Sequence, residues 1–288
     1  MKLFHHNPFG AILLSLCFIA ITADSKNFRI MSFNIRLVTP DDGKNIWYNR
    51  SNEVCKFIQK QAPDVFGLQE ATQIQMDDIS RQLTDYGFVG WGRDDGKQKG
   101  EYSPVFFDKT KYRLVKSGVF WLSETPDEVS FGWDAVCRRT CSWVVLQDLK
   151  TGNSFVFADT HLDHKGKEAR TRGAMLIKER LSRIAGNIPM MITGDFNVTD
   201  QSEAYTTMLT RFFPLADAYK AAQKREGLKA SFHNWGKIPE KEGDIIDFIF
   251  LSPSIKVKKA TIYDSSLGDG YFLSDHHPII ADLDAKSL

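Results

Sequence analysis

Short apolar runs of this 288-residue sequence repeatedly end in carboxylate, amide or imidazole side chains. One such side chain is more often a turn former or a helix cap. Several that converge at one edge of a sheet form the usual active site of an α/β protein. Oxygen ligands without cysteine suit Mg²⁺ or Mn²⁺, and histidines beside carboxylates suit acid–base work. The pattern predicts metal-assisted hydrolysis by the residues Asn34, Glu70, His161, Asp195, Asn197, Asp275 and His276.

Asp247 differs from these residues because it stands inside the apolar run 245–250. A lone carboxylate buried in a strand is costly unless it is paired, hydrogen-bonded or bound to a metal. We therefore expect Asp247 to have a partner of its own.

The elements that must position these side chains are many short strands and a few amphipathic helices. Apolar spacing predicts one helix that ends near Ala62, a second around residues 76–83 and a third over 174–184. A βα-barrel would need strands that alternate strictly with helices, and this sequence lacks that order. The pattern therefore favours an α/β sandwich of two sheets. The strands are expected at residues 28–34, 65–68, 102–107, 119–122, 142–146, 155–157, 190–193, 245–250, 257–263 and 278–282.

Residues 1–23 resemble a secretory signal, with Lys2 ahead of an apolar stretch from Ala11 to Ile21 and small residues before Asp24. The stretch is well short of the roughly 20 residues that span a bilayer. We expect an exported protein, periplasmic or secreted, with one domain over residues 24–288. Lipid anchoring through Cys17 is the weaker alternative, because Leu16 stands where a lipoprotein signal normally has Gly, Ala or Ser.

Charge and cysteine content restrict the partners of the mature chain. The whole chain carries a formal net charge of +1 with ordinary globular composition, and general nucleic-acid binders usually show a basic excess. Cys55, Cys137 and Cys141 remain after removal of the leader, an odd number. On one strand, Cys137 and Cys141 would lie about 13 Å apart at ~3.3 Å per residue, too far for a disulfide. All three are expected to be small buried side chains.

Six short motifs, spread in order over residues 28–280, resemble those of the endonuclease/exonuclease/phosphatase superfamily. Any one of them is weak, since Gly-Asp-x-Asn alone occurs by chance, but the ordered set is specific. The motifs are Met31-Ser32-Phe33-Asn34, Leu68-Gln69-Glu70, Thr160-His161-Leu162, Thr193-Gly194-Asp195-Phe196-Asn197, Ile246-Asp247-Phe248-Ile249-Phe250 and Ser274-Asp275-His276-His277-Pro278.

The resemblance implies a DNase-I-like fold, a four-layer sandwich of two mixed β-sheets flanked by helices, and a Mg²⁺ or Mn²⁺ cofactor. It implies that Glu70, Asn34 and Asp275 hold the metal. Asp195 would orient or activate water, and Asn197 would bind the scissile phosphate. His276 would be the catalytic histidine with Asp247 as its partner. His161 would contact the phosphate or assist the leaving group, oriented by Glu101.

Other side chains have an ordinary structural interpretation beside the functional one. Arg139 is as consistent with a surface salt bridge as with a bidentate phosphate contact. His233 is as consistent with packing in a turn as with a substrate loop. Asp159 and His164 are expected to be solvated. The tryptophans are expected in the core rather than stacked on a base, namely Trp47, Trp91, Trp121 and Trp133.

The substrate stays open between several phosphoesters, because fold does not fix function. The sequence departs from inositol 5-phosphatases at Ile192-Thr193 and is most similar to the branch that contains nocturnin and the deadenylases. Nucleic acid or a nucleotide is the leading expectation, cleaved at a phosphodiester bond by a monomer without an obligate protein partner. A phosphatase or phospholipid phosphodiesterase on the same scaffold, and a non-catalytic binding module, are the alternatives. A basic stripe at the site would favour a polymer, and a closed pocket would favour a small phosphoester.

Overall fold

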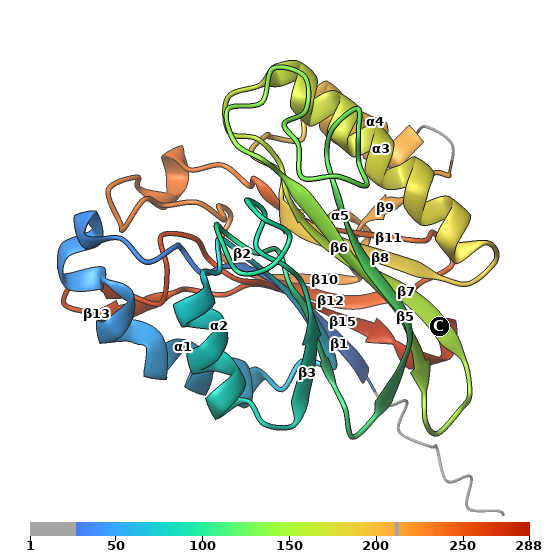
Figure 1. Cartoon of the computed structure of the whole chain (residues 1–288). Coiled ribbons are helices and arrows are strands. Elements are labelled where there is room, and N and C mark those ends of the chain that lie inside the picture. The colour runs from blue at the N-terminus through green and yellow to red at the C-terminus, as the bar shows by residue number, and fades with distance from the viewer. Residues whose placement is uncertain (1–26, 211–212) are drawn as a thin grey trace, which may run out of the picture.

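The computed structural model describes residues 27–210 and 213–288 as two β-sheets packed face to face between helices (Figure 1). The predicted leader and Cys17 lie outside the described residues. Helices α1 (Trp47–Gln61) and α2 (Gln73–Gln82) lie against one sheet, and α3 (Lys167–Ala185) and α4 (Glu203–Thr210) lie against the other. These four layers confirm the predicted DNase-I-like sandwich.

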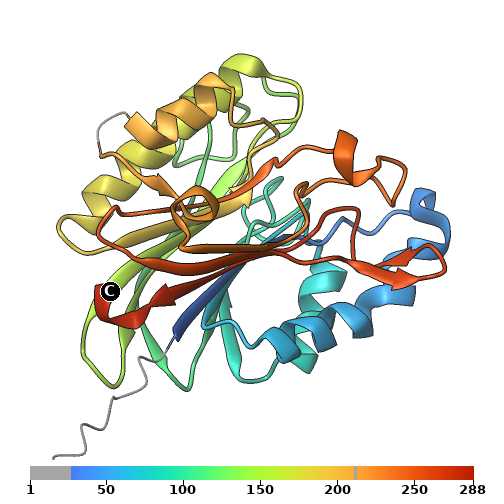
Figure 2. The same ribbon diagram turned by 180° about the vertical axis from the view of Figure 1, so that it is seen from behind.

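The first sheet has seven strands in the order β10-β12-β15-β1-β2-β4-β3. Figure 2 shows the C-terminal strand β15, in red, beside the blue β1, and the two are antiparallel. Strands β1 and β2 are parallel, so their carboxyl ends reach the same edge. The strands are β1 (Asn27–Asn34), β2 (Val65–Gln69), β3 (Tyr86–Val89), β4 (Val105–Asp108), β10 (Lys224–Gly227), β12 (Val257–Ile262) and β15 (Ile279–Asp284).

The second sheet has six strands in the order β5-β6-β7-β8-β11-β9. Strands β7 and β8 are parallel and end together at His161 and Asp195, and β11 runs antiparallel to β8. The strands are β5 (Tyr112–Trp121), β6 (Thr140–Asp148), β7 (Ser154–His161), β8 (Met190–Asp195), β9 (Ala216–Asp217) and β11 (Asp247–Leu251).

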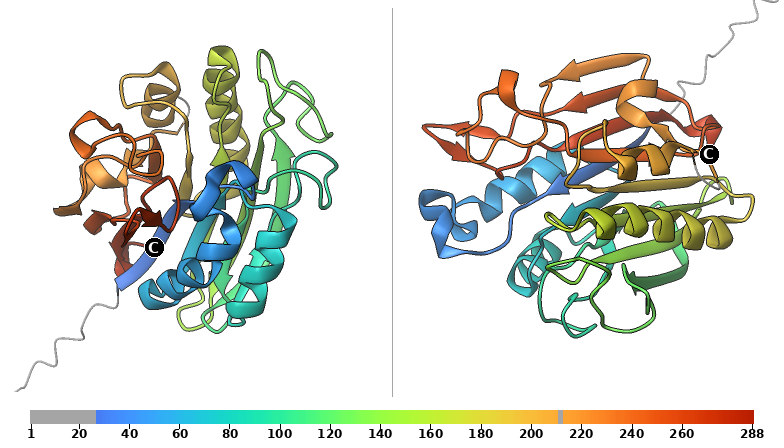
Figure 3. Two further views of the ribbon diagram at one scale, coloured as in Figure 1. Left: turned by 90° about the vertical axis from the view of Figure 1, so that its left-hand side faces the viewer. Right: turned by 90° about the horizontal axis from the view of Figure 1, so that it is seen from above.

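Short elements complete the fold around the sheets. The hairpin of β13 (Ser266–Gly268) and β14 (Tyr271–Phe272) extends beside η1 (Pro40–Asn45), at the end of the molecule opposite the C-terminus (Figure 3). The remaining helical pieces are α5 (Ala218–Ala221), η2 (Glu240–Glu242) and η3 (Ala285–Ser287). Within the described ranges, no helix combines the length and apolarity needed to cross a membrane.

Three apolar layers explain why the central strands are apolar on both faces. Ile30 of β1 packs between the sheets with Phe155 and Phe157 of β7, whereas Met31 and Phe33 face α1 and α2. Ile177 and Leu181 of α3 cover the outer face of the second sheet. Burial on both sides of a strand gives a continuous apolar run instead of alternation.

Most predicted elements are confirmed, but several strand boundaries differ; β5, for example, begins at Tyr112 instead of residue 119. The run 102–107 forms a strand only from Val105, because Tyr102 makes an isolated bridge with Ala71. The run 245–250 forms a strand only from Asp247, whose register partner is Asp195. Asp247 is therefore the first residue of β11 rather than an interior one, and it stands at the sheet edge where β8 ends.

Gly67 of β2 allows the two sheets to approach closely beneath that edge. A Cβ at this position would lie 1.9 Å from Asp159 Oδ1 and 2.4 Å from Thr193 Oγ1. Asp159 Oδ1 accepts hydrogen bonds from Gln69 Nε2 at 2.6 Å and from Thr193 Oγ1 at 2.7 Å. The prediction of a solvated Asp159 is wrong, because this carboxyl is fully buried and burial raises its pKa well above the usual range.

Candidate functional site

The strand ends of both sheets surround one pocket of about 580 Å³. Parallel pairing brings Asn34 beside Gln69 at one edge and His161 beside Asp195 at the other. The pocket is lined by Arg36, Leu37, Asp41, Asp42, Glu70, Arg93, Glu101, Cys137, Arg139, His161, His164, Asp195, Asn197, Phe232, Asn234, Trp235, Lys237, Ile246, Asp275 and His276. With Asn34 and Asp247, which contact members of this set, every side chain predicted for the site lies at one place.

His276 and two carboxylates form the buried centre of the pocket. Nδ1 of His276 lies 2.8 Å from Oδ2 of Asp247, and Nε2 lies 3.8 Å from Oδ2 of Asp195. The backbone N–H of Asp247 donates to Ser231 Oγ at 3.1 Å, and the ring of Phe232 packs 4.8 Å from the His276 ring. These contacts fix the imidazole with Nε2 directed toward Asp195.

The electrostatics of this centre favour a positively charged imidazole beside a carboxyl group that can gain or lose a proton. Burial lowers the pKa of His276, but attraction to Asp247 outweighs it and raises the pKa to about 10. Burial and repulsion by Asp247 raise the pKa of Asp195 to about 7. His276 can therefore stabilise negative charge, and Asp195 can exchange a proton near neutral pH.

Asn197 and His161 lie on the opposite side of Asp195. Asn197 Nδ2 donates to His161 Nε2 at 2.9 Å and to the Leu162 carbonyl at 3.0 Å. Asn197 has a left-handed φ of 50°, held by its backbone N–H, which donates to Asp195 Oδ1 at 2.9 Å. Burial, with Arg139 and Arg93 nearby, lowers the pKa of His161 well below its usual value. His161 is thus a neutral imidazole with its proton on Nδ1.

Glu101 is near His161 without hydrogen-bonding to it. Its Oε2 is 3.8 Å from His161 Nδ1 and 2.8 Å from Arg93 Nη1. Arg93 Nη2 contacts Oε1 at 2.7 Å, so Glu101 is bound by a fork of two donors. The carboxylate faces the protonated nitrogen of His161, in agreement with the orienting role that the family resemblance implies, but it is engaged mainly by Arg93.

Glu70, Asp275 and Asn34 provide the oxygen-rich edge that a hard cation needs. Asn34 Nδ2 donates to Glu70 Oε1 at 3.2 Å and to Asp195 Oδ2 at 3.0 Å. Burial raises the pKa of Glu70, yet Arg36 and His276 outweigh it, so its net pKa is lowered. Burial raises the pKa of Asp275. Uncompensated buried carboxylates are costly, and a divalent ion between them would remove that cost, so these residues fit Mg²⁺ or Mn²⁺.

Arg139 is a buried guanidinium at the wall of the pocket, only 5% exposed. Its Nη2 lies 3.2 Å from His164 Nδ1, whereas its Nε and Nη1 have no hydrogen-bond partner among the described residues. The expected surface position is wrong, but ion pairing is present, because Nε lies 3.8 Å from Asp163 Oδ2 and Nη1 lies 3.9 Å from Glu101 Oε2. A buried guanidinium with unused donors beside a phosphoester site is suited to bind an anionic oxygen.

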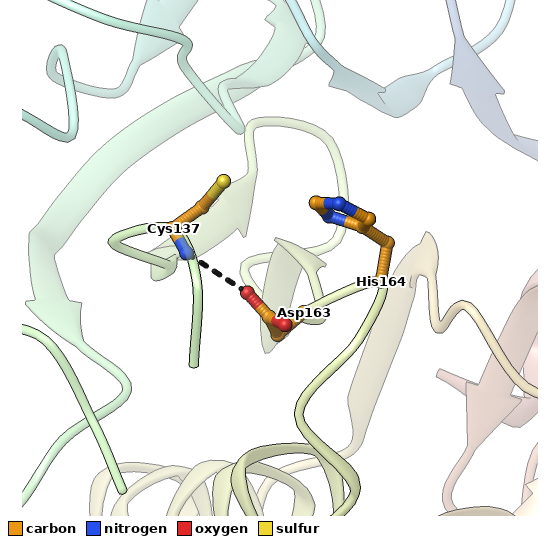
Figure 4. A group of neighbouring side chains, drawn as sticks. All are labelled: Cys137, Asp163 and His164. Carbon is orange, nitrogen blue, oxygen red and sulfur yellow. Dashed lines mark hydrogen bonds between the residues drawn. The ribbon is translucent and has the colours of Figure 1, made fainter. Parts of the chain in front are cut away.

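Cys137, Asp163 and His164 form a second group whose ligand atoms lie close together (Figure 4). Asp163 is already engaged, because its Oδ2 accepts from the backbone N–H groups of Val136 and Cys137 at 3.1 Å. Its Oδ1 accepts from two further backbone N–H groups, of Lys165 and Gly166. We interpret the group as a hydrogen-bonded loop junction. Cys137 is half-buried at the pocket instead of in the core, whereas Cys55 and Cys141 are buried as predicted.

His233 packs in the turn rather than lining the pocket. Its ring stacks on His277 with 4.0 Å between centroids, and its Nε2 lies 2.9 Å from Ser265 Oγ. Trp47 and Trp121 are buried, as expected for core residues. The expectation is wrong for Trp91, which is exposed, and for Trp133, which is half-buried.

Several pocket residues were not predicted from the sequence, among them Arg36, Arg93 and Trp235. Arg36 lies between Glu70 Oε2, 3.7 Å from its Nη1, and Asp42, 3.3 Å from its Nε. Trp235 Nε1 donates to Asp42 Oδ1 at 3.3 Å. Arg36 follows the first motif by two residues, which is the one signal that could have identified it.

Comparisons with known proteins agree with this geometry. Residues 31–276 match the Endonuclease/Exonuclease/phosphatase family. A Bacteroides vulgatus structure described as endonuclease/exonuclease/phosphatase is 43% identical, with 90% of this chain and 98% of that chain covered and a TM-score of 0.87. A mannosyl-6-phosphatase of Bacteroides thetaiotaomicron is 36% identical, with 89% and 99% covered and a TM-score of 0.83. The human nocturnin catalytic domain, at 21% identity and a TM-score of 0.71 over 89% and 93% of the chains, shares the fold.

Two uncharacterised proteins of Acanthamoeba polyphaga mimivirus are each 24% identical to the chain, over 59% and 81% of its length. The matched region spans 30% of the length of the first and 91% of the second. The family match covers most of the sequence, and its limits include the strand-end residues that form the pocket. The chain belongs to the Endonuclease/Exonuclease/phosphatase family.

Proposed function

We propose that this chain is a divalent-metal-dependent phosphatase that removes phosphate from a small phosphorylated sugar. The observation that carries the proposal is the buried contact of His276 with Asp247 and Asp195, beside the acidic edge of Glu70 and Asp275. The family acts on phosphoesters, and the relative at 36% identity is named as a mannosyl-6-phosphatase.

The shape and charge of the pocket favour a small ester over a polymer. Its volume of about 580 Å³ is in the range of small-molecule sites. Arg93 and Arg36, which would otherwise form a basic surface, are paired with Glu101 and with Asp42. Asp41 and Asp42 line the same pocket, and a run of nucleic-acid phosphates would be repelled by them.

Glu70, Asp275 and Asn34 would hold the metal, which would supply Lewis-acid stabilisation of phosphoryl charge. Asp195 accepts a proton from the attacking water as the water oxygen bonds to phosphorus. His276 Nε2–H donates to a phosphoryl oxygen and stabilises the charge that develops there. Asn197 can donate to the phosphate as well when it releases the hydrogen bond that its Nδ2 makes to His161 Nε2. The ester P–O bond breaks, the leaving oxygen takes up one proton from solvent, and Asp195 returns its proton to solvent, so the products are an alcohol and inorganic phosphate.

We also propose that the protein is exported, on the basis of the signal-like residues 1–23. We further propose that it acts as a monomer. Extraction of the protein from the periplasm or medium, compared with the cytoplasm, tests the location. Size-exclusion chromatography with light scattering tests the oligomeric state.

Phosphodiester hydrolysis of a nucleotide or nucleic acid is the second candidate. The observation in its favour is the half-buried Trp235 ring at the pocket, since an aromatic face can stack a base.

One substrate panel separates the two candidates. Phosphate release or strand cleavage is measured with Mg²⁺, with Mn²⁺ and with EDTA on mannose 6-phosphate, glucose 6-phosphate, glycerol 3-phosphate, a dinucleotide, single-stranded DNA, RNA and sphingomyelin. Metal-dependent release of phosphate from the sugar phosphates, lost in His276→Ala, supports the proposal. Cleavage of the dinucleotide or the polymers with no release from sugar phosphates would establish the second candidate instead. A folded protein that cleaves no member of the panel would contradict both.

A further inference from the structure

Trp235 forms one wall of the pocket and its position is fixed from two sides. The Arg50 guanidinium lies over one face of the indole, 5.3 Å from the ring centroid, and the indole N–H donates to Asp42. Arg50 is itself buried at 2% exposure and donates to the carbonyls of Ile35 and Leu273. The ring is half-buried and lines the pocket, and we infer that the face away from Arg50 is the one that meets a ligand.

The backbone that carries Trp235 is held in a conformation that L-residues rarely adopt. Asn234 and Trp235 both have left-handed φ values, 46° and 57°. The Asn234 N–H donates to the Asp275 carbonyl at 3.2 Å, and the Gly236 N–H donates to His233 Nδ1 at 2.9 Å. Strain of this kind persists where the surroundings impose it, and it is concentrated at functional sites. The strained turn places the indole next to the catalytic residues, because Phe232 of the same segment packs on His276.

The groups that line the pocket with the indole are polar and of both charge signs, because Arg36 and Lys237 lie there together with Asp41 and Asp42. Asp41 lines the pocket as an exposed carboxylate, and the half-buried Asn234 amide lines it too. Asp42, by contrast, is engaged by Arg36 and Trp235 and serves to orient them. A flat apolar face flanked by a free carboxylate and an amide matches a ring that is apolar on its C–H face and carries hydroxyl donors at its edge.

We propose that Trp235, Asp41 and Asn234 form a subsite for the pyranose ring of the leaving group. The ring stacks on the open face of Trp235, its hydroxyls donate to Asp41 and Asn234, and its phosphate reaches His276 and Asn197. The subsite rests on the proposed phosphatase function and names the part of the substrate that the catalytic residues do not recognise. Arg50 is a positioning residue for it, because it supports the covered face of the indole.

The test compares two substrates that differ in the ring. For wild type, Trp235→Ala, Trp235→Phe and Asp41→Ala, kcat/KM is measured on glucose 6-phosphate and on glycerol 3-phosphate. We expect the ratio of the two values to fall about tenfold in Trp235→Ala, which corresponds to the loss of one stacking contact. It should fall severalfold in Asp41→Ala, and Trp235→Phe should retain most of it because a flat ring remains. Trp91→Ala, at an exposed tryptophan outside the pocket, is the matched control and should behave as wild type.

The outcomes separate the subsite from the phosphatase. A Trp235→Ala ratio within twofold of wild type, in a protein with an unchanged melting temperature, overturns the subsite and leaves the phosphatase standing. If Trp235→Ala has a lower melting temperature than the wild type, the ratios measured for Trp235→Phe and Asp41→Ala test the subsite instead. If the wild type cleaves no phosphomonoester, the phosphatase fails, and calorimetric binding of glucose 6-phosphate to His276→Ala, with and without Trp235→Ala, tests the subsite alone. A tenfold loss on a dinucleotide without a loss on the hexose phosphate would assign the indole to a base and overturn the proposal.

Discussion

Nδ1 of His276 and Oδ2 of Asp247 are 2.8 Å apart in a site where both side chains are almost completely buried. The two residues come from separate segments, since Asp247 begins β11 and His276 precedes β15. The other imidazole nitrogen faces Asp195, the register partner of Asp247. The His276 ring thus lies between Asp247, which keeps the imidazole positively charged, and Asp195, which can exchange a proton.

Replacing Asp247 by asparagine should lower kcat by about 10² to 10⁴-fold, the usual contribution of a positioned acid–base group. The substitution removes the charge that raises the pKa of His276 to about 10. In the wild type, kcat/KM should rise as Asp195 ionises near pH 7 and fall as His276 loses its proton. In Asp247→Asn the falling limb should move to lower pH. The pH profile of both proteins checks this, and an unmoved falling limb would show that another group is responsible.

Glu70→Gln should remove most of the stabilisation that Mg²⁺ gives the protein. A ligand that binds only the folded state raises the melting temperature by mass action. The wild type should therefore melt at a higher temperature with Mg²⁺ than with EDTA, and the variant should show a much smaller difference. Without metal, the variant should be somewhat less stable at neutral pH, because Arg36 and His276 favour the ionised carboxylate that the substitution removes. Glu53→Gln, at an exposed pair with Lys56, is the control and should respond as wild type. A full response in Glu70→Gln would exclude Glu70 as a principal ligand.

The sequence was sufficient to predict the two-sheet fold and the place of the site. Strands buried on both faces leave long apolar runs, and polar residues at their ends must gather where parallel strands end together. Asn34, Glu70, His161 and Asp195 were identifiable for this reason. The start of β11 was misplaced because Ile245 and Ile246 continue the apolar pattern although they lie before the strand.

The sequence could not predict contacts that depend on segments distant in the chain. Aspartate is a residue type common in turns, and Asp159 lies at a strand end. It is nevertheless buried, because Gly67 of another strand leaves room for it. Trp235 becomes a pocket wall only through Arg50 and Asp42, which are almost 200 positions away. No local periodicity encodes either relationship.

Gly67→Ala should destabilise the protein by at least ~1–3 kcal/mol, the cost of overpacking a tight core. The added Cβ would displace Asp159 and Thr193, whose oxygens stand 1.9 and 2.4 Å from its position. Asp159→Asn is the matched control. Burial raises the pKa of the Asp159 carboxyl and so favours its neutral form, and an amide of the same shape should therefore cost less than Gly67→Ala does. Urea unfolding measures both, and equal stability of Gly67→Ala and wild type would contradict the close approach of the sheets.

Acid should weaken the protein through His233 and His277. Burial, together with neighbouring positive charge, lowers the pKa of each histidine to about 4. In the unfolded chain the pKa is about 6.5, so the unfolded state binds more protons between those values. The free energy of unfolding should therefore fall as the pH drops from about 6.5 to 4, by up to about 1.4 kcal/mol per pH unit for each histidine.

His277→Asn tests the assignment of that slope to this pair. His277 Nδ1 accepts a hydrogen bond from the Ser265 N–H at 3.0 Å, and the asparagine side-chain oxygen can accept in its place. Because the amide does not titrate, the free energy of unfolding of the variant should depend less steeply on pH, by the contribution of one histidine. The structure of the turn should be kept. Urea unfolding with EDTA at several pH values between 4 and 7 measures the slope. A slope equal to that of the wild type would mean that the stacked ring of His277 titrates normally in the folded protein, and that the acid sensitivity arises elsewhere.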